Sequence, residues 1–523
     1  MADAERPGRR AQLPMLLACC GLAVLLGVLP GQDANWDLRN YHFYNPYAWL
    51  NGRLDLDVAP AQIQSWLIPI WDLWYFSLAR AHIDSRPLTG LLSLPAGVAL
   101  YLLGLIGGRI SPAGLRGVKW VALLAVAATA AGSGPLIGTT MSEWHNAVLI
   151  LLGAWLVLVA RDRPDRRMLL HALAGLCSGV AMGLKLTAMP FAAGLAAMVV
   201  ASPGSARERA SSVAALAAGG AAGFLAIYGP WGWMLYRRYA NPFFPFFNDL
   251  FHSPLVPWQS YRDDRYAAKS LVDLLALPLR MARAKAGTVA ELPLRDMRLA
   301  LALPSIAFAS WRTTACPRIE RGPWRAATVF FLVSFVLWAR LFAMIRYAGV
   351  LELFSALFIT LAVTSLAPGR WGATVQLIVA GLVMASTAQP QWGRVPHGAP
   401  AVLAQAPSIP KDAMVVIATL NPVAYVVPSL PPQVPVVALV NNFLRPGPQA
   451  AELQRRALER VRRHPGPLLL LTTREANQER YYTGERILDF LTQMSLEADL
   501  GHCRPVRSPL DGDAVVLCPL AAR

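Results

Sequence analysis

The sequence is poor in charged residues, which make up only 15% of its 523 positions against 55% for hydrophobic residues. A soluble globular chain carries about 25% charged residues. The shortage coincides with long apolar runs and a mean hydropathy of +0.40. These features exclude a soluble enzyme, a disordered protein, a collagen-like chain and a disulfide-rich scaffold, and they predict a polytopic membrane protein.

Several catalytic motifs are also missing. The chain has no Walker loop, no HExxH, no GxSxG and no CxxC, so nucleotide-driven transport, zinc hydrolysis and serine hydrolysis lose their usual signatures. The formal charge of +17 comes from 48 basic and 31 acidic residues. Much of the positive charge lies in short loops between apolar runs, which favours orientation in a membrane over binding of nucleic acid.

Apolar runs of about 17–22 residues predict roughly eleven membrane-spanning helices. The first run follows basic residues but no small-x-small cleavage site follows it, so we expect an uncleaved span. We place the spans at 13–29, 87–107, 117–134, 143–160, 169–184, 188–202, 209–229, 297–311, 324–340, 347–367 and 371–388. In one of them, Gly175, Gly179 and Gly183 form a small-residue stripe that predicts a close helix contact.

Basic residues alternate between the predicted loops as the positive-inside rule requires. Every second loop carries one or more arginines, whereas the loop 135–142 has neither Lys nor Arg. We therefore expect a multi-pass membrane protein with a cytoplasmic N-terminus and an extracytoplasmic C-terminal segment. Lys185, Arg340 and Arg346 then lie on the outer side, where they need a separate explanation.

The predicted fold class is a polytopic α-helical membrane protein with interfacial helices in its first outer loop and a small α/β domain on the outer side. Its transmembrane domain is 1–388 with outer loops 31–86 and 230–296, a Pro-rich linker is 389–410, and the α/β domain is 411–523. Strand-like stretches lie at 414–418, 434–440, 467–472 and 514–517, and helical spacing at Leu453, Ala457 and Val461.

Two cysteines of this domain, Cys503 and Cys518, would lie in an oxidising compartment and could pair. Buried free thiols are the alternative.

The first outer loop opens with polar and aromatic residues directly after a span. Asp37 follows Asp33 by about one helical turn, and Tyr41 follows by another. A carboxylate with such neighbours suits a general base that acts on a sugar or lipid hydroxyl. The alternative is that Asp33 or Asp37 caps a helix. Supporting candidates in the same stretch are Arg39 and His42.

Further along this loop, Leu67, Trp71, Trp74 and Leu78 are spaced to share one face of a helix. The segment is aromatic but too polar to span, so we expect it to lie flat at the membrane interface. Asp72 lies on its polar side, either as part of a site or as a solvated carboxylate.

A second aromatic segment, 228–258, contains prolines that forbid a continuous helix. We expect a re-entrant or interfacial hairpin in which Asn241, Phe244 and Asn248 line a cavity for a long lipid chain or acceptor. An aromatic anchor without a ligand is the alternative.

The cations at the outer ends of spans are costly unless they are paired or functional. A phosphate would offset the cost of placing Lys185 and Arg346 there, through charge-assisted hydrogen bonds. The alternatives are snorkelling to lipid headgroups or pairing with Glu352 or Glu143. Glu143 begins a span on the same side and could be a second carboxylate of the same cavity, or it could favour a helix N-terminus.

Together these residues resemble the membrane-integral GT-C glycosyltransferase superfamily, and more closely a bacterial branch of it. The resemblance covers roughly 10–390 and is weak beyond. The stretches that carry it are Asn35–His42, Gly183–Thr187, Asn241–Pro254 and Arg346–Glu352.

The resemblance implies an inverting transferase that moves a sugar from a polyprenyl-phosphate donor to a lipid, glycan or protein acceptor on the outer face. It implies that Asp37 is the base and that Lys185 and Arg346, with Tyr347, bind the donor phosphate. The family pattern often has two adjacent acids, whereas this chain has Leu38 beside Asp37. Some members bind a divalent metal at this loop, but the sequence has no dedicated ligand cluster, so we assign no metal residue.

Three other functions stay open. A transporter or lipid-linked-sugar flippase would need polar residues near mid-membrane and broken spans in corresponding halves. A periplasmic glycan polymerase or ligase would use lipid-linked sugars on a different fold. A non-catalytic membrane scaffold would use its C-terminal domain as the working part.

Overall fold

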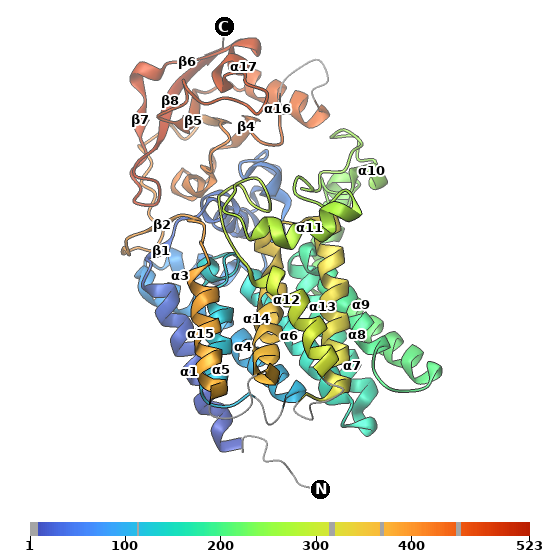
Figure 1. Cartoon of the computed structure of the whole chain (residues 1–523). Coiled ribbons are helices and arrows are strands. Elements are labelled where there is room, and N and C mark those ends of the chain that lie inside the picture. Colours follow the sequence, from blue (N-terminus) through green and yellow to red (C-terminus); the bar gives the residue numbers. More distant parts are fainter. Residues whose placement is uncertain (1–8, 112–114, 313–318, 367–370, 446–450, 523) are drawn as a thin grey trace. The chain divides into compact units, whose positions relative to one another are not determined.

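The computed structural model describes residues 9–111, 115–312, 319–366, 371–445 and 451–522 (Figure 1). The chain contacts divide it into two units. The helical unit comprises Met1–Leu29, Gly90–Pro230 and Asp263–Gln391, and the sheet unit comprises Pro30–Thr89, Trp231–Arg262 and Trp392–Arg523. The domain boundaries at 388 and 411 stay a prediction.

Helices lie at all eleven places where the sequence predicts a span. They are α1 Arg9–Val28, α4 Ser85–Ile110, α5 Val118–Ala128, α6 Glu143–Ala160, α7 Arg167–Leu184, α8 Met189–Val200, α9 Ala206–Tyr239, α12 Arg298–Arg312, α13 Arg321–Leu341, α14 Gly349–Leu366 and α15 Trp371–Ala385. Residue 367, the last of one predicted span, lies outside the described residues.

Within the described residues, six helices are long and apolar enough to cross a membrane: α4, α6, α9, α13, and α7 and α14 with the short helical turns that precede them. Four shorter apolar helices lie at Gln12–Val28, Val118–Ala128, Leu186–Val200 and Trp371–Ala385. The helix α12 is in neither group. The structure therefore contains a largely helical, apolar unit, and a count of eleven spans stays a prediction.

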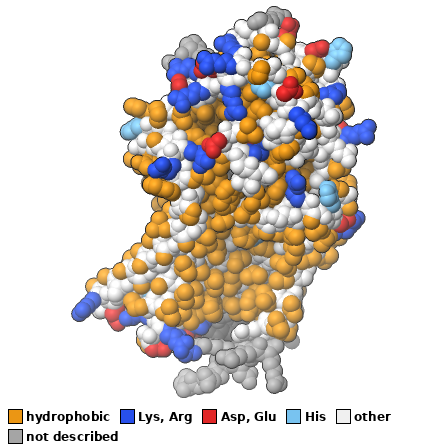
Figure 2. All heavy atoms as spheres, turned by 180° about the vertical axis from the view of Figure 1, so that it is seen from behind, with side chains coloured by type: hydrophobic (Ala, Val, Ile, Leu, Met, Phe, Trp, Pro, Cys, Tyr) orange, Lys and Arg blue, Asp and Glu red, His pale blue; other side chains and the backbone are white. Residues whose placement is uncertain are grey.

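The helix α14 forms the core of the helical unit. Its residues Gly349 to Ser365 are all buried, and it packs against α12, α5 and α6 (Figure 1). A helix that is apolar on every side needs neighbours all around it, which explains this central place. Exposed apolar side chains lie on other helices, such as Leu377, Ile378 and Leu382 of α15. Figure 2 shows hydrophobic side chains gathered over the surface of the helices.

The predicted glycine stripe makes a close helix contact. A Cβ added at Gly175 would lie 1.9 Å from the Leu216 carbonyl oxygen of α9, and one at Gly179 would lie 2.0 Å from that of Gly220. Gly183 faces Ile227 in the same way. The backbones of α7 and α9 thus approach each other as small residues allow, and the predicted contact is confirmed.

A buried charged network joins three other parts of the helical unit. The Arg298 guanidinium donates to Asp296 Oδ2 at 2.9 Å, with exposed side-chain fractions of 0% and 1%. Asp296 also accepts from the Ala131 amide. Glu352 of α14 accepts from the amides of Gly132 and Ser133, each at 2.8 Å. The acids therefore hold the 131–133 turn, and Glu352 is engaged there rather than as an ion-pair partner of Arg346.

The sheet unit contains a mixed sheet with strand order β4-β3-β5-β8-β6, and β7 pairs with β8. Its elements are β3 Met414–Ala418, η8 Ala424–Ser429, β4 Val436–Val440, α16 Glu452–Arg462, β5 Leu468–Thr473, α17 Ile487–Gln493, β6 Leu496–Ala498, η9 Leu500–His502, β7 Arg504–Pro505 and β8 Val515–Ala522. The strands β3, β4 and β5 are parallel, and β8 is antiparallel to β5. All four predicted strands and the helix at 453–461 are confirmed.

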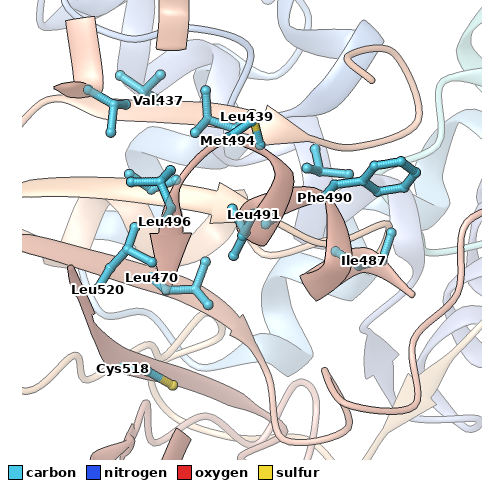
Figure 3. Packing of buried hydrophobic residues seen from close by; sticks show 14 of the residues in the cluster. Val437, Leu439, Leu470, Ile487, Phe490, Leu491, Met494, Leu496, Cys518 and Leu520 are labelled. Atoms are coloured by element: carbon cyan, nitrogen blue, oxygen red, sulfur yellow. The ribbon is translucent and has the colours of Figure 1, made fainter. Parts of the chain in front are cut away.

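The core of this sheet lies between its strands and the two helices. Leu439, Leu470 and Leu496 of the strands belong to one buried cluster with Phe490 and Leu491 of α17 (Figure 3). The strands β3 and β4 are buried along their whole length, as expected for parallel strands covered on both faces.

The 30–89 segment carries η1 Leu38–His42, α2 Tyr44–Leu50, η2 Arg53–Asp55, η3 Gln62–Trp66 and α3 Leu73–Arg80. Val58 pairs in parallel with Val437, so this segment extends the edge of the sheet at β4. The Arg53–Asp57 ion pair, with exposed side-chain fractions of 2% and 1%, lies beside this bridge. Arg53 donates to the carbonyls of Pro432 and Val434, and Asp57 accepts from the Val436 amide.

The predicted continuous helix through Leu67, Trp71, Trp74 and Leu78 is wrong. The 3-10 turn η3 ends at Trp66, Leu67 has extended dihedrals (φ −70°, ψ 143°), and α3 begins only at Leu73. Pro69 explains the break, because proline disfavours helical backbone before it and cannot donate a helical hydrogen bond.

The predicted linker contains an ordered strand. β2, Arg394–Val395, pairs antiparallel with β1, Gln32–Asp33, with Arg394 opposite Asp33. The amide of Ala34 also donates to the Gly393 carbonyl at 3.2 Å. The start of the C-terminal segment is therefore hydrogen-bonded to the loop that carries the candidate acids.

Candidate active site

Lys185 lies at a break between two helices of the helical unit. The helix α7 ends at Leu184, Lys185 is extended (φ −155°, ψ 112°), and the turn η6, Leu186–Ala188, leads into α8. Pro190 at the start of α8 explains this break. Proline is favoured in the first turn of a helix, but its ring clashes with the backbone of a helical turn that precedes it. A residue at a helix break can direct its side chain away from both helix axes.

The Lys185 ammonium contacts an acid and an aromatic ring. Its Nζ lies 2.5 Å from Glu143 Oε1, and the exposed side-chain fractions are 18% and 6%. The same nitrogen lies 5.2 Å from the centre of the Tyr347 ring, which is cation–π distance. The pairing of Lys185 with Glu143, one of the alternatives that the sequence left open, is therefore present. The contacts of Lys185 bring together residues from α6, from the α7–α8 break and from η7, Ile345–Ala348.

Arg346 precedes Tyr347 in the same turn. Its guanidinium lies 3.9 Å from Met141 Sδ and 3.7 Å from Met344 Sδ. Asp263 lies outside the predicted spans. Burial raises the pKa of Asp263, but hydrogen bonds and charge from Arg265 lower it more strongly, and the charge of Arg346 adds a smaller lowering, so the pKa is below its usual value.

These side chains line one pocket of the helical unit. Its polar and charged residues are Glu143, Asn146, Lys185, Thr187, Arg346 and Tyr347, and its apolar wall includes Phe191 and Val350. Two cations and one carboxylate therefore share a concave, partly apolar site. Such a site favours a ligand with an anionic group, because a low-dielectric wall strengthens charge-assisted hydrogen bonds.

Asp37 lies in the sheet unit, directly before η1. The Tyr41 hydroxyl donates to Asp37 Oδ2 at 3.2 Å, and Asp37 is 7% exposed. Its side chain makes no capping hydrogen bond to the turn that follows, so the capping interpretation does not hold for Asp37. Asp33 differs, because its Oδ1 accepts from the Asn35 amide at 3.0 Å, as in a local turn.

His42 and Asp72 form a buried pair in the same unit, with Nδ1 and Oδ1 2.8 Å apart. Asp72 therefore has a histidine partner and is not the solvated carboxylate of the alternative interpretation. Burial raises the pKa of the nearby Tyr75, and the charges of Asp33 and Asp72 add to this. The charges of Asp33 and Asp72 are therefore both close to the buried Tyr75.

Arg39 lies in η1, which contacts η8. Its charge lowers the pKa of Asp511, although burial raises that pKa more strongly, and the Tyr425 hydroxyl donates to the same carboxylate. Arg39 therefore faces the C-terminal part of the sheet unit.

Asn241, Phe244 and Asn248 are each 0% exposed, so they line no water-sized space. Asn241 Nδ2 donates to the Phe246 carbonyl and to Asn248 Oδ1. Asn248 Nδ2 is within hydrogen-bond distance of three backbone carbonyls, those of Ser253, Val256 and Pro257. The predicted cavity role for these three residues is wrong, because the two asparagines hold the proline-rich turn by hydrogen bonds and the Phe244 ring packs against Trp66 and Tyr239.

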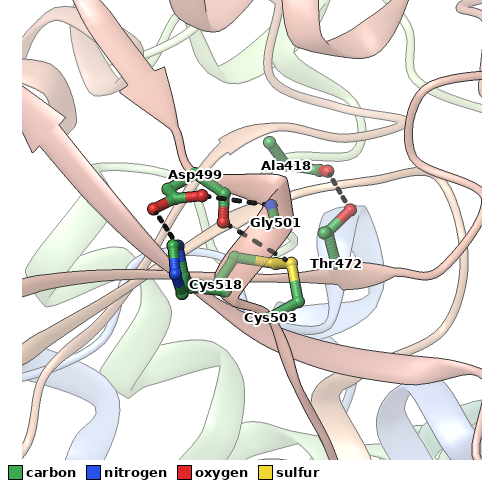
Figure 4. The surroundings of a disulfide bond; sticks show 7 residues. Ala418, Thr472, Asp499, Gly501, Cys503 and Cys518 are labelled. Atoms are coloured by element: carbon green, nitrogen blue, oxygen red, sulfur yellow. Dashed lines mark hydrogen bonds and ion pairs between the residues drawn. A yellow bond between two sulfur atoms is a disulfide. The ribbon is translucent and has the colours of Figure 1, made fainter.

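Cys503 and Cys518 are joined by a disulfide (Figure 4). It ties the loop before β7 to β8. Beside it, Asp499 contacts His502 and the amide of Gly501. This pairing agrees with an oxidising compartment for the C-terminal segment.

The described residues contain no group of three or more His, Cys, Asp or Glu side chains that could hold a metal ion. Asp33 and Asp37 do not assemble such a set. The divalent metal that the resemblance allows therefore has no such donor set among these described residues.

Two features escaped the sequence analysis. Arg394, opposite Asp33, lies in a stretch predicted as linker, and burial lowers its pKa against the opposing charge of Asp33. The Asp296–Arg298 pair joins residues two apart in sequence at the start of α12. An acid and a base this close to an apolar run could have indicated the Asp296–Arg298 pair. No local pattern indicates that Arg394 lies opposite Asp33.

No family model and no curated protein matches the sequence. Among solved structures, the chain is similar to ArnT from Cupriavidus metallidurans bound to undecaprenyl phosphate, with 14% sequence identity, a TM-score of 0.49 and coverage of 98% of each chain.

Proposed function

We propose that this protein is an inverting membrane glycosyltransferase, which moves a sugar from a polyprenyl-phosphate donor to a lipid, glycan or protein acceptor on the outer face of a bacterial inner membrane. One observation carries the proposal. Lys185 at the α7–α8 break lines a single pocket of an apolar helical unit together with Arg346 and Tyr347, which both belong to η7. Two cations in such a pocket suit the phosphate of a lipid-linked sugar.

Lys185 and Arg346 have complementary roles in this proposal. Arg346 presents a planar guanidinium that can donate two parallel hydrogen bonds to phosphate oxygens. Lys185 is held by Glu143 and by the Tyr347 ring, so its ammonium is positioned before the donor arrives. Charge grows on the phosphate oxygen as the glycosidic bond breaks, and one well-aimed donor at such a position is worth about 3–4 kcal/mol.

Asp37 is the proposed base. The acceptor hydroxyl oxygen attacks the anomeric carbon, and its proton passes to the Asp37 carboxylate. The bond between the anomeric carbon and the phosphate oxygen breaks, and polyprenyl phosphate leaves with the bonding electrons. A single displacement of this kind inverts the configuration at the anomeric carbon. The burial of Asp37 and its contact with Tyr41 support this role, because they fix a carboxylate that makes no capping hydrogen bond.

The test is kinetic. Asp37→Asn removes the base but keeps the size of the side chain, so we expect kcat to fall about 10²- to 10⁴-fold with little change in donor affinity. Asp33→Asn is the matched control, since Asp33 is engaged with the Asn35 amide, and its effect on kcat is expected to be much smaller. A folded, inserted Asp37→Asn variant that transfers sugar at the normal rate would remove the base assignment.

A further inference from the structure

The pocket of the helical unit contains two buried oxygens that are not satisfied by the protein. Glu143 Oε2 and Asn146 Oδ1 are buried, and neither has a hydrogen-bond partner within the described ranges, 9–111, 115–312, 319–366, 371–445 and 451–522. The two residues are 9% and 8% exposed. They are three positions apart on α6 and so lie on one face of it, and both line the pocket.

A ligand that satisfies these two oxygens has to donate hydrogen bonds to them. An ionised carboxylate and an amide oxygen only accept hydrogen bonds. The diester phosphate of a lipid-linked sugar also carries acceptors alone, so it cannot satisfy them. Lys185 engages the other carboxylate oxygen, Oε1. The missing partners are therefore hydrogen-bond donors, and a sugar brings several of these next to the phosphate as hydroxyl or N–H groups.

We propose that Glu143 and Asn146 bind the sugar of the donor, through the hydroxyl or amino hydrogens on the carbon next to the anomeric carbon. This inference rests on the proposed function. Glu143 forms an ion pair with Lys185, the cation to which we assign phosphate binding. The sugar substituent closest to an anomeric phosphate is the one on the neighbouring ring carbon, so it is the group that can reach both acceptors.

Such an arrangement makes the pocket selective. A site that hydrogen-bonds a substrate hydroxyl disfavours an analogue without it, because buried polar groups are then left unpaired. Asn146 is the better residue to change, since Glu143 also holds Lys185. Asn146→Ala removes the acceptor, whereas Asn146→Asp keeps one and serves as the conservative control.

The experiment measures lipid binding to the full-length protein in nanodiscs. The probes are polyprenyl phosphate alone, polyprenyl phosphate carrying glucose, mannose or N-acetylglucosamine, and polyprenyl phosphate carrying 2-deoxyglucose. For the wild type, we expect at least one of the three complete sugars to bind about tenfold to a hundredfold more tightly than the 2-deoxy analogue. Asn146→Ala should abolish that preference while leaving affinity for polyprenyl phosphate unchanged, and Asn146→Asp should retain it.

Three outcomes would overturn the inference, and the third is distinguishable because it also removes the proposed phosphate role. If polyprenyl phosphate binds but every sugar-bearing probe binds no more tightly than the 2-deoxy analogue, the sugar contact is wrong and the phosphate role stands. If Asn146→Ala weakens all probes equally, the sugar contact is wrong as well. If the wild type binds none of the probes, both the phosphate role and the sugar contact are wrong.

Discussion

Replacing Lys185 with methionine removes a cation from the pocket and leaves the Glu143 carboxylate without its partner. The two side chains are in contact at 2.5 Å, and Glu143 is the more buried, with 6% of its side chain exposed. Removing one partner of a buried ion pair costs about 3–5 kcal/mol, most of it from the unpaired charge that remains. Because 18% of the Lys185 side chain is exposed, we expect a loss near the lower limit, about 3 kcal/mol.

A double variant separates this loss of stability from a loss of function. Lys185→Met combined with Glu143→Gln removes both charges, so no buried ion remains unpaired and most of the stability should return. Affinity for polyprenyl phosphate should not return, because the cation is still absent. This probe carries no sugar, so the Glu143 substitution does not affect it through a sugar contact. We expect binding to weaken about tenfold to a hundredfold in both variants.

The assays are thermal unfolding in detergent and polyprenyl phosphate binding in nanodiscs. A double variant that binds polyprenyl phosphate as tightly as the wild type would refute the phosphate role of Lys185. A single Lys185→Met variant with wild-type stability would refute the reasoning about the buried pair, whatever its binding.

Three further predictions concern stability. Arg298→Met leaves Asp296 buried without its cation and should cost about 3–5 kcal/mol; an unchanged thermal midpoint would contradict this. Gly179→Ala places a Cβ 2.0 Å from a carbonyl oxygen of α9 and should cost about 1–3 kcal/mol, whereas Gly108→Ala, which meets nothing within 4 Å, should be neutral by the same thermal assay. Burial raises the pKa of Glu479 despite its hydrogen bonds, so its stabilising contribution is complete below the ordinary glutamate pKa of about 4.3 and is lost as pH rises through the raised value. The thermal midpoint of the wild type relative to that of Glu479→Gln should therefore decrease as the pH rises above the ordinary glutamate pKa of about 4.3, and a difference that grows with pH would contradict the prediction.

Much of the secondary structure was accessible from the sequence because its causes are local. Apolar runs gave helices at each predicted place, and the strand at Met414–Ala418 is found with its predicted bounds. The glycine stripe around Gly179 indicated a close helix contact, since small residues are what such a contact requires. Patterns of this kind depend on neighbours within one or two turns of the chain.

Features that depend on distant partners were not accessible. Arg394 pairs with Asp33 across more than three hundred residues, and nothing near either residue specifies the other. The helical face through Trp71 is predicted from residue spacing alone. Pro69 interrupts the helix, so the residues on either side of it do not share one face. The buried environment of Asn248 could not be predicted, because the sequence around an asparagine in a proline-rich turn does not show whether its side chain binds a ligand or backbone carbonyls.

The candidate site lies between these two cases. The positions of Lys185 and Arg346 at the ends of spans signalled a function, because a cation there is costly without a partner. The pairing of Lys185 with Glu143 was one of several alternatives that the sequence left open, and the structure identifies it. Asn146 carried no signal, because an amide one turn after an acid at a helix start is common on any helix.

The most direct test of the central claim is the fate of the lipid-linked sugar itself. Purified protein in proteoliposomes would receive a radiolabelled polyprenyl-phosphate sugar together with a membrane extract as the source of acceptor. The account predicts that polyprenyl phosphate is released, that the label appears on an acceptor with inverted anomeric configuration, and that Asp37→Asn abolishes both. Movement of intact lipid-linked sugar across the bilayer without cleavage would contradict it and would indicate a flippase instead.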